Sequence, residues 1–374
     1  MVPKHKLITS IRHNDMTHIN NRIGVMMLAV MLAACSNSDS TDDITDASPQ
    51  NEIRLKADVW HVMPGTRATT YASGVQTSGS FTAAAYIENT TTPYINPVQV
   101  NWDTNKWAWN DGKHYWPATG KLDFFAYMPA TAPSYITAGP TYSAPGSPGV
   151  PQAQFTCASL PMTYNASDTE AGQGSSLQEF IWGITAGQNK TNAGEGVTMK
   201  FRHPFARINF QLAANHSKIQ INSITFKNLK TGGTCTLNGT DIAETYYYTT
   251  SVWSSLTPAE GGSDLVMTLA NKDGEGNWIA ADVNTFNTSS SATPIGGYSS
   301  DAHQFVDLIM VPQTFAGTIE VNASWNDWGD TPVPHTVTTT IPPINWEAGK
   351  SYTYTFNIST DDLVVNVTNY TEQW

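Results

Sequence analysis

The chain has 374 residues, only 13% of them charged, and a formal net charge of −12 at pH 7. A chain this acidic does not bind nucleic-acid backbones by charge, and its length suits two domains of ordinary size. Twelve Trp and 15 Tyr residues supply enough apolar surface for folded cores, which excludes a disordered chain. Low charge together with many β-branched and aromatic residues favours β structure.

The N-terminal region has the shape of a secretory signal. Arg22 precedes an apolar run at 26–34, which is too short to span a bilayer permanently. Leu32-Ala33-Ala34-Cys35 resembles the lipobox of bacterial lipoproteins, where the cysteine thiol is diacylated and cleavage leaves that cysteine as the first residue. We therefore expect residues 1–34 to be a lipoprotein signal peptide and Cys35 to be lipidated. The alternative is an ordinary signal peptide that happens to precede a cysteine.

A polar stretch follows the lipobox. Residues 35–51 are rich in Ser, Asp and Thr and show no apolar periodicity. Such a composition is typical of a flexible chain. We expect an acidic tether between the membrane and the folded part of the protein.

The first predicted strand comes directly after the tether. Apolar and charged residues alternate from 52 to 59, as in a strand with one buried face. The residues of the apolar face are Ile53, Leu55, Ala57 and Val59. Next, Pro64-Gly65 and small polar residues predict a loop, and this loop contains Arg67.

Further strands are predicted along the rest of the chain. Alternation or continuous apolar runs indicate strands at 98–102, 106–109, 122–128, 207–212, 219–226, 305–311, 319–325, 352–358 and 363–367. The first two are predicted to form a hairpin around residues 103–105. Strands separated by turn signals, without a long amphipathic helix, predict an all-β fold of sandwiches or barrels. We place an N-terminal β-sandwich domain at 52–195 and a C-terminal β-sandwich domain at 196–374.

Motifs for catalysis and cofactor binding are weak. Gly349-Lys350-Ser351 looks like the end of a phosphate-binding loop, but Ile344 occupies the position of the required first glycine. No GxSxG or HExxH motif occurs. His203 precedes Pro204 in a strand-like stretch and is interpreted as structural. We expect no enzyme activity, cofactor or metal site.

Two other patterns have competing interpretations. Residues 271–276 partly match a calcium-binding loop, with Asp282 at the twelfth position. Flanking helices are not predicted, so we favour a hairpin turn. Cys157 and Cys235 show no zinc-type spacing. They could bridge or stay free, and we expect free thiols.

Four stretches form a pattern when they are taken together: Tyr115-Trp116-Pro117 with the strand 122–129, the stretch 201–208, Val311-Pro312-Gln313-Thr314-Phe315, and the stretch 346–354. Their order and spacing, with the lipobox in front, resemble the fimbrillin family of Gram-negative gut and oral anaerobes. The resemblance covers residues 52–374. It implies two transthyretin-like β-sandwiches in tandem and export as a lipoprotein to the surface of the outer membrane. It further implies that an arginine-specific protease removes the first strand, and that a strand of another fimbrial subunit fills the groove.

The resemblance also implies roles for particular residues. Thr66-Arg67-Ala68 matches the processing site of fimbrillins, so cleavage after Arg67 would leave Ala68 as the first residue. The displaced strand would be the one that contains Ile53. The strand with Leu363, Val365 and Val367 is a candidate donor strand; the alternative is that it is the last strand of its own domain.

The leading hypothesis is a structural subunit of a surface fimbria that supports adhesion, in a shaft or tip position rather than as the anchor. Its partners would be other fimbrial subunits, the arginine-specific protease, the outer membrane before processing, and host proteins or glycans. The alternative is a surface glycan-binding lipoprotein whose aromatic residues stack on sugars. A glycosidase would need two facing carboxylates, and no such pair is singled out in the sequence.

Overall fold

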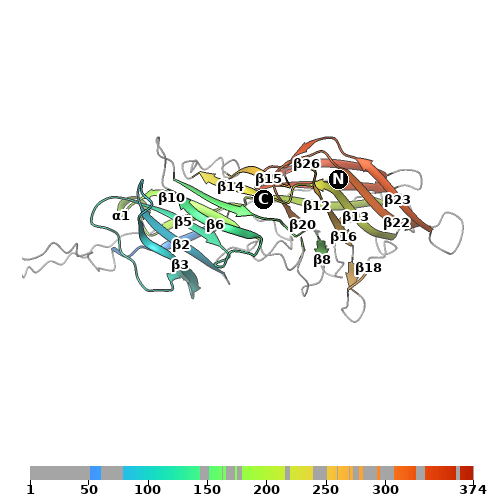
Figure 1. Cartoon of the computed structure of the whole chain (residues 1–374). Coiled ribbons are helices and arrows are strands. Elements are labelled where there is room, and N and C mark those ends of the chain that lie inside the picture. Colours follow the sequence, from blue (N-terminus) through green and yellow to red (C-terminus); the bar gives the residue numbers. More distant parts are fainter. Residues whose placement is uncertain are drawn as a thin grey trace, which may run out of the picture. The chain divides into compact units, whose positions relative to one another are not determined.

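A computed structural model describes residues 51–373, with gaps. The gaps are 60–78, 144–150, 162, 166–172, 175–178, 215–219, 239–250, 259, 269, 273–277, 281–292, 295–306, 326–332 and 359–362. Cys35, Arg67 and Ala68 lie outside the described residues. Nearly all the regular secondary structure of the described chain is strand (Figure 1), which confirms the all-β prediction. Its one helix, α1 (Lys190–Ala193), has four residues, and no helix in this part could cross a membrane.

The first sheet has seven strands in the order β10-β5-β2-β3-β4-β1-β11. The bounds are β1 (Leu55–Val59), β2 (Ser80–Ile87), β3 (Pro93–Asp103), β4 (Lys106–Trp109), β5 (Leu122–Met128), β10 (Ile181–Gln188) and β11 (Val197–Phe201). Neighbours are antiparallel except β1 and β11. The predicted hairpin at 98–109 is confirmed, because β3 and β4 pair from Val100↔Trp109 to Asp103↔Lys106.

The two edge strands of this sheet approach each other. Trp182 of β10 and Arg202, just after β11, exchange both backbone hydrogen bonds, with N–O distances of 3.2 and 2.8 Å. Gly183 permits this approach, since a Cβ there would clash with the carbonyl of Lys200. The sheet therefore curls towards closure, and β1 and β11 complete its circumference. Inside lies a core that includes Ile53, Phe81, Trp107 and Phe201.

A second core lies against the outer face of β5 and β10. It includes Phe125, Phe155, Trp182 and Phe205. A four-stranded sheet, in the order β15-β14-β7-β6, covers it. These strands are β6 (Ile136–Ser143), β7 (Gln152–Cys157), β14 (Gly232–Asn238) and β15 (Ser251–Thr257).

The remaining strands form two larger sheets and two short pairs. One sheet holds β19 (Thr293–Pro294), β12 (Ala206–Ala214), β25 (Lys350–Ile358) and β26 (Leu363–Gln373), with β20 (Asp307–Met310) also on β12. The other holds β23 (Val333–Thr340), β22 (Thr318–Trp325), β13 (Gln220–Leu229), β16 (Ser263–Thr268), β8 (Thr163–Asn165) and β9 (Gln173–Gly174). The pairs are β17 (Ala270–Lys272) with β18 (Trp278–Ala280) and β21 (Thr314–Phe315) with β24 (Ile344–Asn345).

The predicted domain ranges share sheets. Residue 195 falls between α1 and β11, and β11 pairs with β1 along its whole length. Likewise, β14 of the second range pairs with β7 of the first, from Gly233↔Cys157 to Asn238↔Gln152. Cys157 and Cys235 therefore lie on adjacent strands, both buried and both free thiols, as expected. The tandem organisation stays a prediction.

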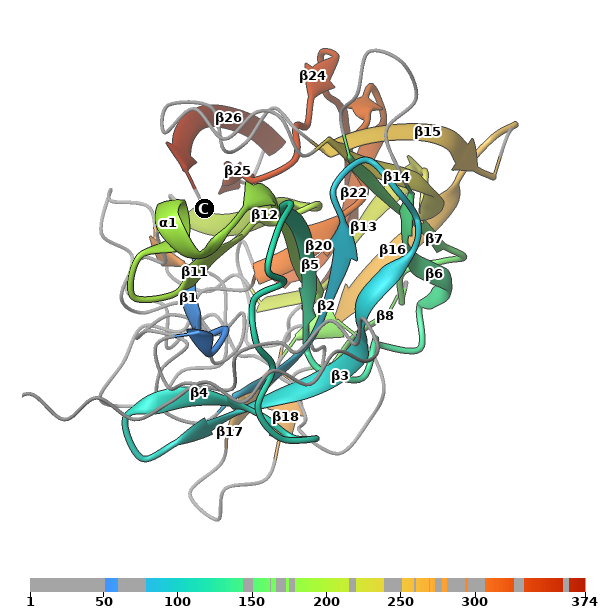
Figure 2. The ribbon, with the colours of Figure 1, turned by 90° about the vertical axis from the view of Figure 1, so that its left-hand side faces the viewer.

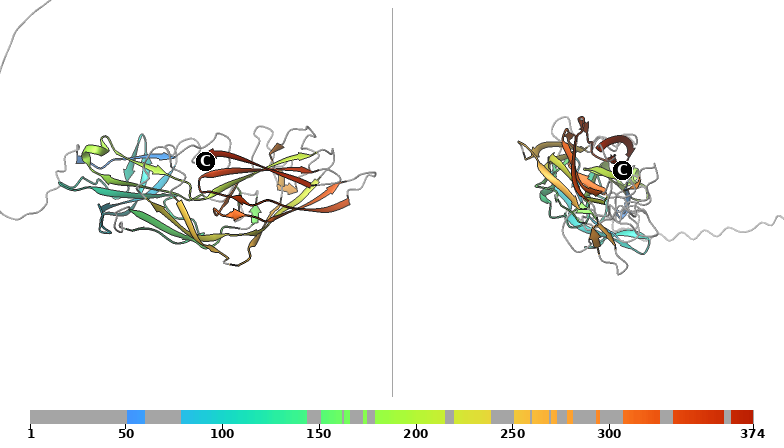
Figure 3. Two further views of the ribbon diagram at one scale, coloured as in Figure 1. Left: turned by 90° about the horizontal axis from the view of Figure 1, so that it is seen from above. Right: turned by 90° about the vertical axis from the view of Figure 1, so that its right-hand side faces the viewer.

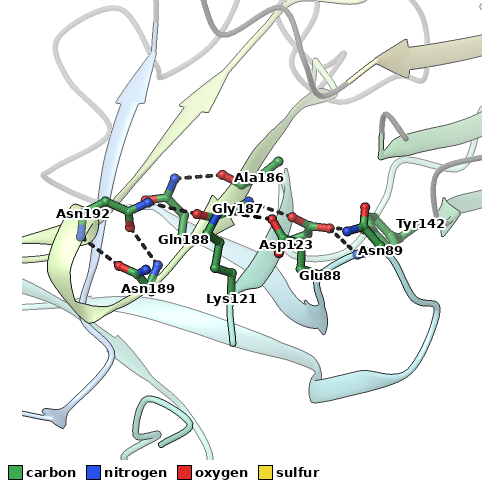
Figure 4. A network of polar contacts seen from close by, with 10 residues as sticks. All are labelled: Glu88, Asn89, Lys121, Asp123, Tyr142, Ala186, Gly187, Gln188, Asn189 and Asn192. Carbon is green, nitrogen blue, oxygen red and sulfur yellow. Dashed lines mark hydrogen bonds and ion pairs between the residues drawn. The ribbon is translucent and has the colours of Figure 1, made fainter. Parts of the chain in front are cut away.

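A buried carboxylate ties three segments around β5 together (Figure 4). Asp123 accepts hydrogen bonds from the Tyr142 hydroxyl at 2.9 Å, from the Gly187 amide at 2.7 Å and from the Asn89 amide at 3.4 Å. Such charge-assisted bonds offset the cost of burying a carboxylate. Asp123 thus fixes the turn after β2 and the end of β10 against β5.

Candidate functional site

The first strand lies inside the seven-stranded sheet and has a neighbour on each side (Figure 2). It pairs with β11 at every residue, from Leu55↔Val197 to Val59↔Phe201. With β4 it pairs at one position only, Leu55↔Trp107. The two sides of β1 are therefore held very unequally.

The residues just before β1 extend its attachment. The Ile53 amide donates to the His114 carbonyl at 2.7 Å, and the Trp116 amide donates to the Asn51 carbonyl at 2.9 Å. These bonds reach the segment that follows β4. They hold the start of the strand, while the half of β1 beyond Leu55 pairs with β11 alone among the described strands.

The side chains of this segment follow the predicted alternation. Ile53 and Leu55 are 1% and 5% exposed, whereas Arg54 and Lys56 are exposed. Ala57 is partly buried and packs on the same core. The side chain of Val59 lies outside the described residues. At about 25 cal/mol per Å² of apolar surface, each fully buried aliphatic side chain contributes roughly 1.5–3 kcal/mol.

Two ion pairs join this segment to other parts of the chain. Glu52 lies 3.5 Å from Lys113, and Lys56 lies 3.5 Å from Glu195. Arg54 is also 3.8 Å from Glu52. Pairs as exposed as these contribute little to stability. Their effect is on register, because a shift of β1 along β11 would separate both pairs.

A groove opens where β1 and β4 fail to pair. It has a volume of about 830 Å³ and is lined by residues 52–57, by β4 and by the segments that hold Lys113 and Glu195. Trp102 and Trp107 form part of its apolar wall. β4 pairs with β1 at one position only, so most of the β4 edge that lines this groove has no strand partner among the described residues.

The last strand occupies an ordinary position in its own sheet. β26 pairs antiparallel with β25, from Ile358↔Leu363 to Lys350↔Gln373, and the two strands lie side by side at the red end of the colour scale in Figure 3. β25 is its only neighbour among the described strands. The side chains of Leu363, Val365 and Val367 lie outside the described residues. The backbone pairing matches the alternative weighed for this segment, a strand of its own fold.

The motifs behind the resemblance contribute residues to the core and a side chain that is hydrogen-bonded to the backbone of Lys230. Trp346 donates its indole N–H to the Tyr354 hydroxyl at 3.0 Å and stacks on Phe315, with ring centroids 4.9 Å apart. The Gln313 side chain accepts from the Lys230 amide and donates to the Lys230 carbonyl, both at 2.8 Å. Gln313 thus acts as a strand partner for Lys230, and these motifs are structural.

Other candidate residues also have packing roles. His203 is buried, with its Nδ1 2.5 Å from Glu179 Oε1. β17 and β18 flank the calcium-like sequence as a hairpin. Among the described residues, no three His, Cys, Asp or Glu side chains gather closely enough to hold a metal ion.

Three residues of the site were not singled out in the sequence. Trp109 donates its indole N–H to the Ile53 carbonyl, and Lys113 and Glu195 pair with charges of the first strand. A buried Trp usually finds a partner for its N–H, which is a weak signal for Trp109. The two charges carried no signal, because only the folded chain brings them next to β1.

The model of the fimbrillin-like family matches residues 66–374, and the chain belongs to this family. No curated protein matches the chain. A fimbrial protein from Bacteroides vulgatus has a similar structure, with a TM-score of 0.56 at 14% identity, over 87% of this chain and 99% of that one. This likeness supports the fold.

Two other similar structures are described as putative cell adhesion proteins. The one from Bacteroides ovatus has a TM-score of 0.46 at 16% identity, over 85% of this chain and 95% of that one. The one from Bacteroides uniformis has a TM-score of 0.45 at 14% identity, over 86% and 99%.

Proposed function

We propose that the chain is the precursor of a fimbrial subunit, exported as a lipoprotein through Cys35, cleaved after Arg67 and joined to other subunits by strand exchange. The observation that carries this proposal is the position of β1. It is a five-residue strand that fills a place between β4 and β11 and precedes Arg67 in the sequence. Loss of β1 would leave the sheet interrupted at that place.

The binding of a new strand in the place left by β1 is energetically favourable. Removal of the first strand would expose to water the apolar sites of Ile53 and Leu55 and the backbone edge of β11. Filling two such sites again would gain roughly 3–6 kcal/mol, before the cost of ordering the new strand. Pairing along β11 would give the incoming strand its direction and register.

The chain order suits processing at Arg67. Arg67 follows the end of β1 by eight residues, and the family match begins at residue 66, so β1 lies outside it. Cleavage there would cut the covalent link of both β1 and the lipid on Cys35 to the rest of the chain. The subunit would then leave the outer membrane and enter the fimbria, where it supports adhesion to host proteins or glycans.

The test starts from the full-length precursor. Treatment with an arginine-specific protease should give a product that begins at Ala68 and forms a ladder of stable oligomers on a gel run without boiling. An Arg67→Lys variant is the matched control and should stay monomeric. A surface glycan-binding lipoprotein would stay monomeric in both cases. A wild-type product that begins at Ala68 and remains a monomer would show that strand exchange does not occur.

A further inference from the structure

Two of the charged residues that pair with the first strand would remain on the subunit after the strand is removed. Glu52 and Lys56, four residues apart, meet Lys113 and Glu195 respectively. Both receiving residues follow Arg67 in the sequence. They would therefore stay on the subunit when β1 leaves, one at each end of the enlarged groove, which then includes the place of β1.

The receiving charges differ in their surroundings. The Glu52 side chain is 18% exposed and lies within reach of both Lys113 and Arg54, so water partly screens this end of the groove. The pair of Lys56 with Glu195 is more open, with side chains 52% and 92% exposed. Lys113 should therefore discriminate between the charges of partner strands more strongly than Glu195 does, because screening by water weakens an ion pair.

We propose that the groove selects a partner strand with an acidic residue at its first position and a basic residue at its fifth, and with apolar residues at the second and fourth. The proposal rests on the strand exchange argued above. The first and fifth positions correspond to Glu52 and Lys56, and the second and fourth to Ile53 and Leu55. The strand runs parallel to β11, as β1 does.

This pattern disfavours the chain's own last strand as the partner. Leu363–Gln373 holds Glu372 and no Lys, Arg or His. It offers no basic residue to Glu195 in any register. The groove is therefore shaped for a strand from a different fimbrial subunit, one that carries both charges.

The expected selectivity is moderate. Exposed ion pairs change affinity by up to about fivefold each, and misplaced like charges oppose binding to a similar degree. A matched strand should therefore bind about tenfold or more better than the same strand with its two charges exchanged. The apolar residues and the backbone ladder are the same in both, so they do not contribute to this difference.

The test uses the full-length precursor, cleaved by an arginine-specific protease in the presence of fluorescent nine-residue peptides. The matched peptide has the sequence of residues 51–59 with Arg54→Gln, which removes its cleavage site. A second peptide also carries Glu52→Lys and Lys56→Glu, a third has Gln at both positions, and a fourth has the sequence of residues 363–371. Capture by the cleaved protein is measured by gel filtration with fluorescence detection.

We expect the matched peptide to be captured best and the charge-exchanged peptide worst. A Lys113→Glu, Glu195→Lys double variant of the protein should reverse this order. A Lys113→Gln variant should remove most of the preference, and since these side chains are largely exposed, both variants should fold.

Three results would overturn the proposal in distinguishable ways. Equal capture of the first three peptides by the wild-type protein would exclude charge selection while strand exchange itself stands. Capture of none of them by a protein correctly cleaved after Arg67 would remove strand exchange and this proposal together. Stronger capture of the fourth peptide than of the matched one would favour the chain's own last strand and contradict the pattern.

Discussion

The indole Nε1 of Trp109 donates a hydrogen bond of 3.1 Å to the carbonyl oxygen of Ile53. This bond crosses between β4 and the first strand near the single position where their backbones pair, Leu55↔Trp107. A side chain of β4 thus supplies a contact with the residues just before β1, in addition to the single backbone pairing of the two strands. The contact is part of what holds the first strand until it is removed.

Replacement of Trp109 by Phe should loosen the first strand. The change removes the donor and leaves the Ile53 carbonyl with one partner fewer, at a cost of about 1 kcal/mol. Hydrogen exchange of the amides at 51–57 should then become about fivefold faster, while β5 should exchange unchanged. Trp102→Phe, on the same hairpin, is the control; equal acceleration by both variants would mean that the indole bond is not responsible.

The buried face of the first strand should dominate its contribution to stability. Leu55 is 5% exposed, so Leu55→Ala should lower the free energy of unfolding by about 2–4 kcal/mol. The neighbouring Lys56→Ala, on the exposed face, should lower it by less than about 1 kcal/mol. Urea denaturation of the uncleaved precursor measures both, and similar losses would contradict the alternation seen in the structure.

Asp123→Asn should destabilise the turn after β2 and the end of β10. The carboxylate accepts from two backbone amides and from Tyr142, whereas an Asn side chain would turn an N–H group towards one of these donors. The expected loss is about 1–3 kcal/mol in thermal or urea unfolding. Asp111→Asn, at an exposed carboxylate near His114, is the matched control, and a loss of equal size there would argue against the buried network.

Cys157 should resist alkylation in the folded protein. Burial raises the pKa of its thiol to about 12, because the thiolate would lose its hydration. Little thiolate is therefore present at pH 8, and the thiolate is the reactive form. Peptide mapping after iodoacetamide treatment should show slow modification of the native protein and rapid modification in urea.

The same shift predicts the direction of a pH dependence. The ordinary pKa of the thiol is about 9.0, so between about pH 9 and 12 the unfolded chain ionises at Cys157 while the folded chain does not. This contribution to stability is fully present below pH 9 and is lost as the pH rises through that window. A Cys157→Ser variant should show a shallower alkaline decline; an unchanged profile would mean that the thiol is not a source of it.

Much of the local structure could be predicted from the sequence. The alternation from Ile53 to Ala57, the hairpin at 98–109 and the apolar strand at 122–128 all reappear as predicted. These features depend on neighbouring residues, since the period of two in a strand and the preferences of a turn are local properties. The family resemblance likewise rested on short stretches, and the family match extends over residues 66–374.

Only the tertiary structure decided which segments meet. The sequence showed that 52–59 forms a strand with one buried face, but not that this strand runs parallel to β11 or pairs with β4 at a single residue. Nor did it show that Lys113 and Glu195 flank it, or that β7 and β14 join the two predicted domain ranges. Strand partners are chosen by contacts between residues far apart in the chain, whose joint burial must outweigh the entropy of closing the loops between them. The periodicity of one segment therefore does not show which other segment it pairs with.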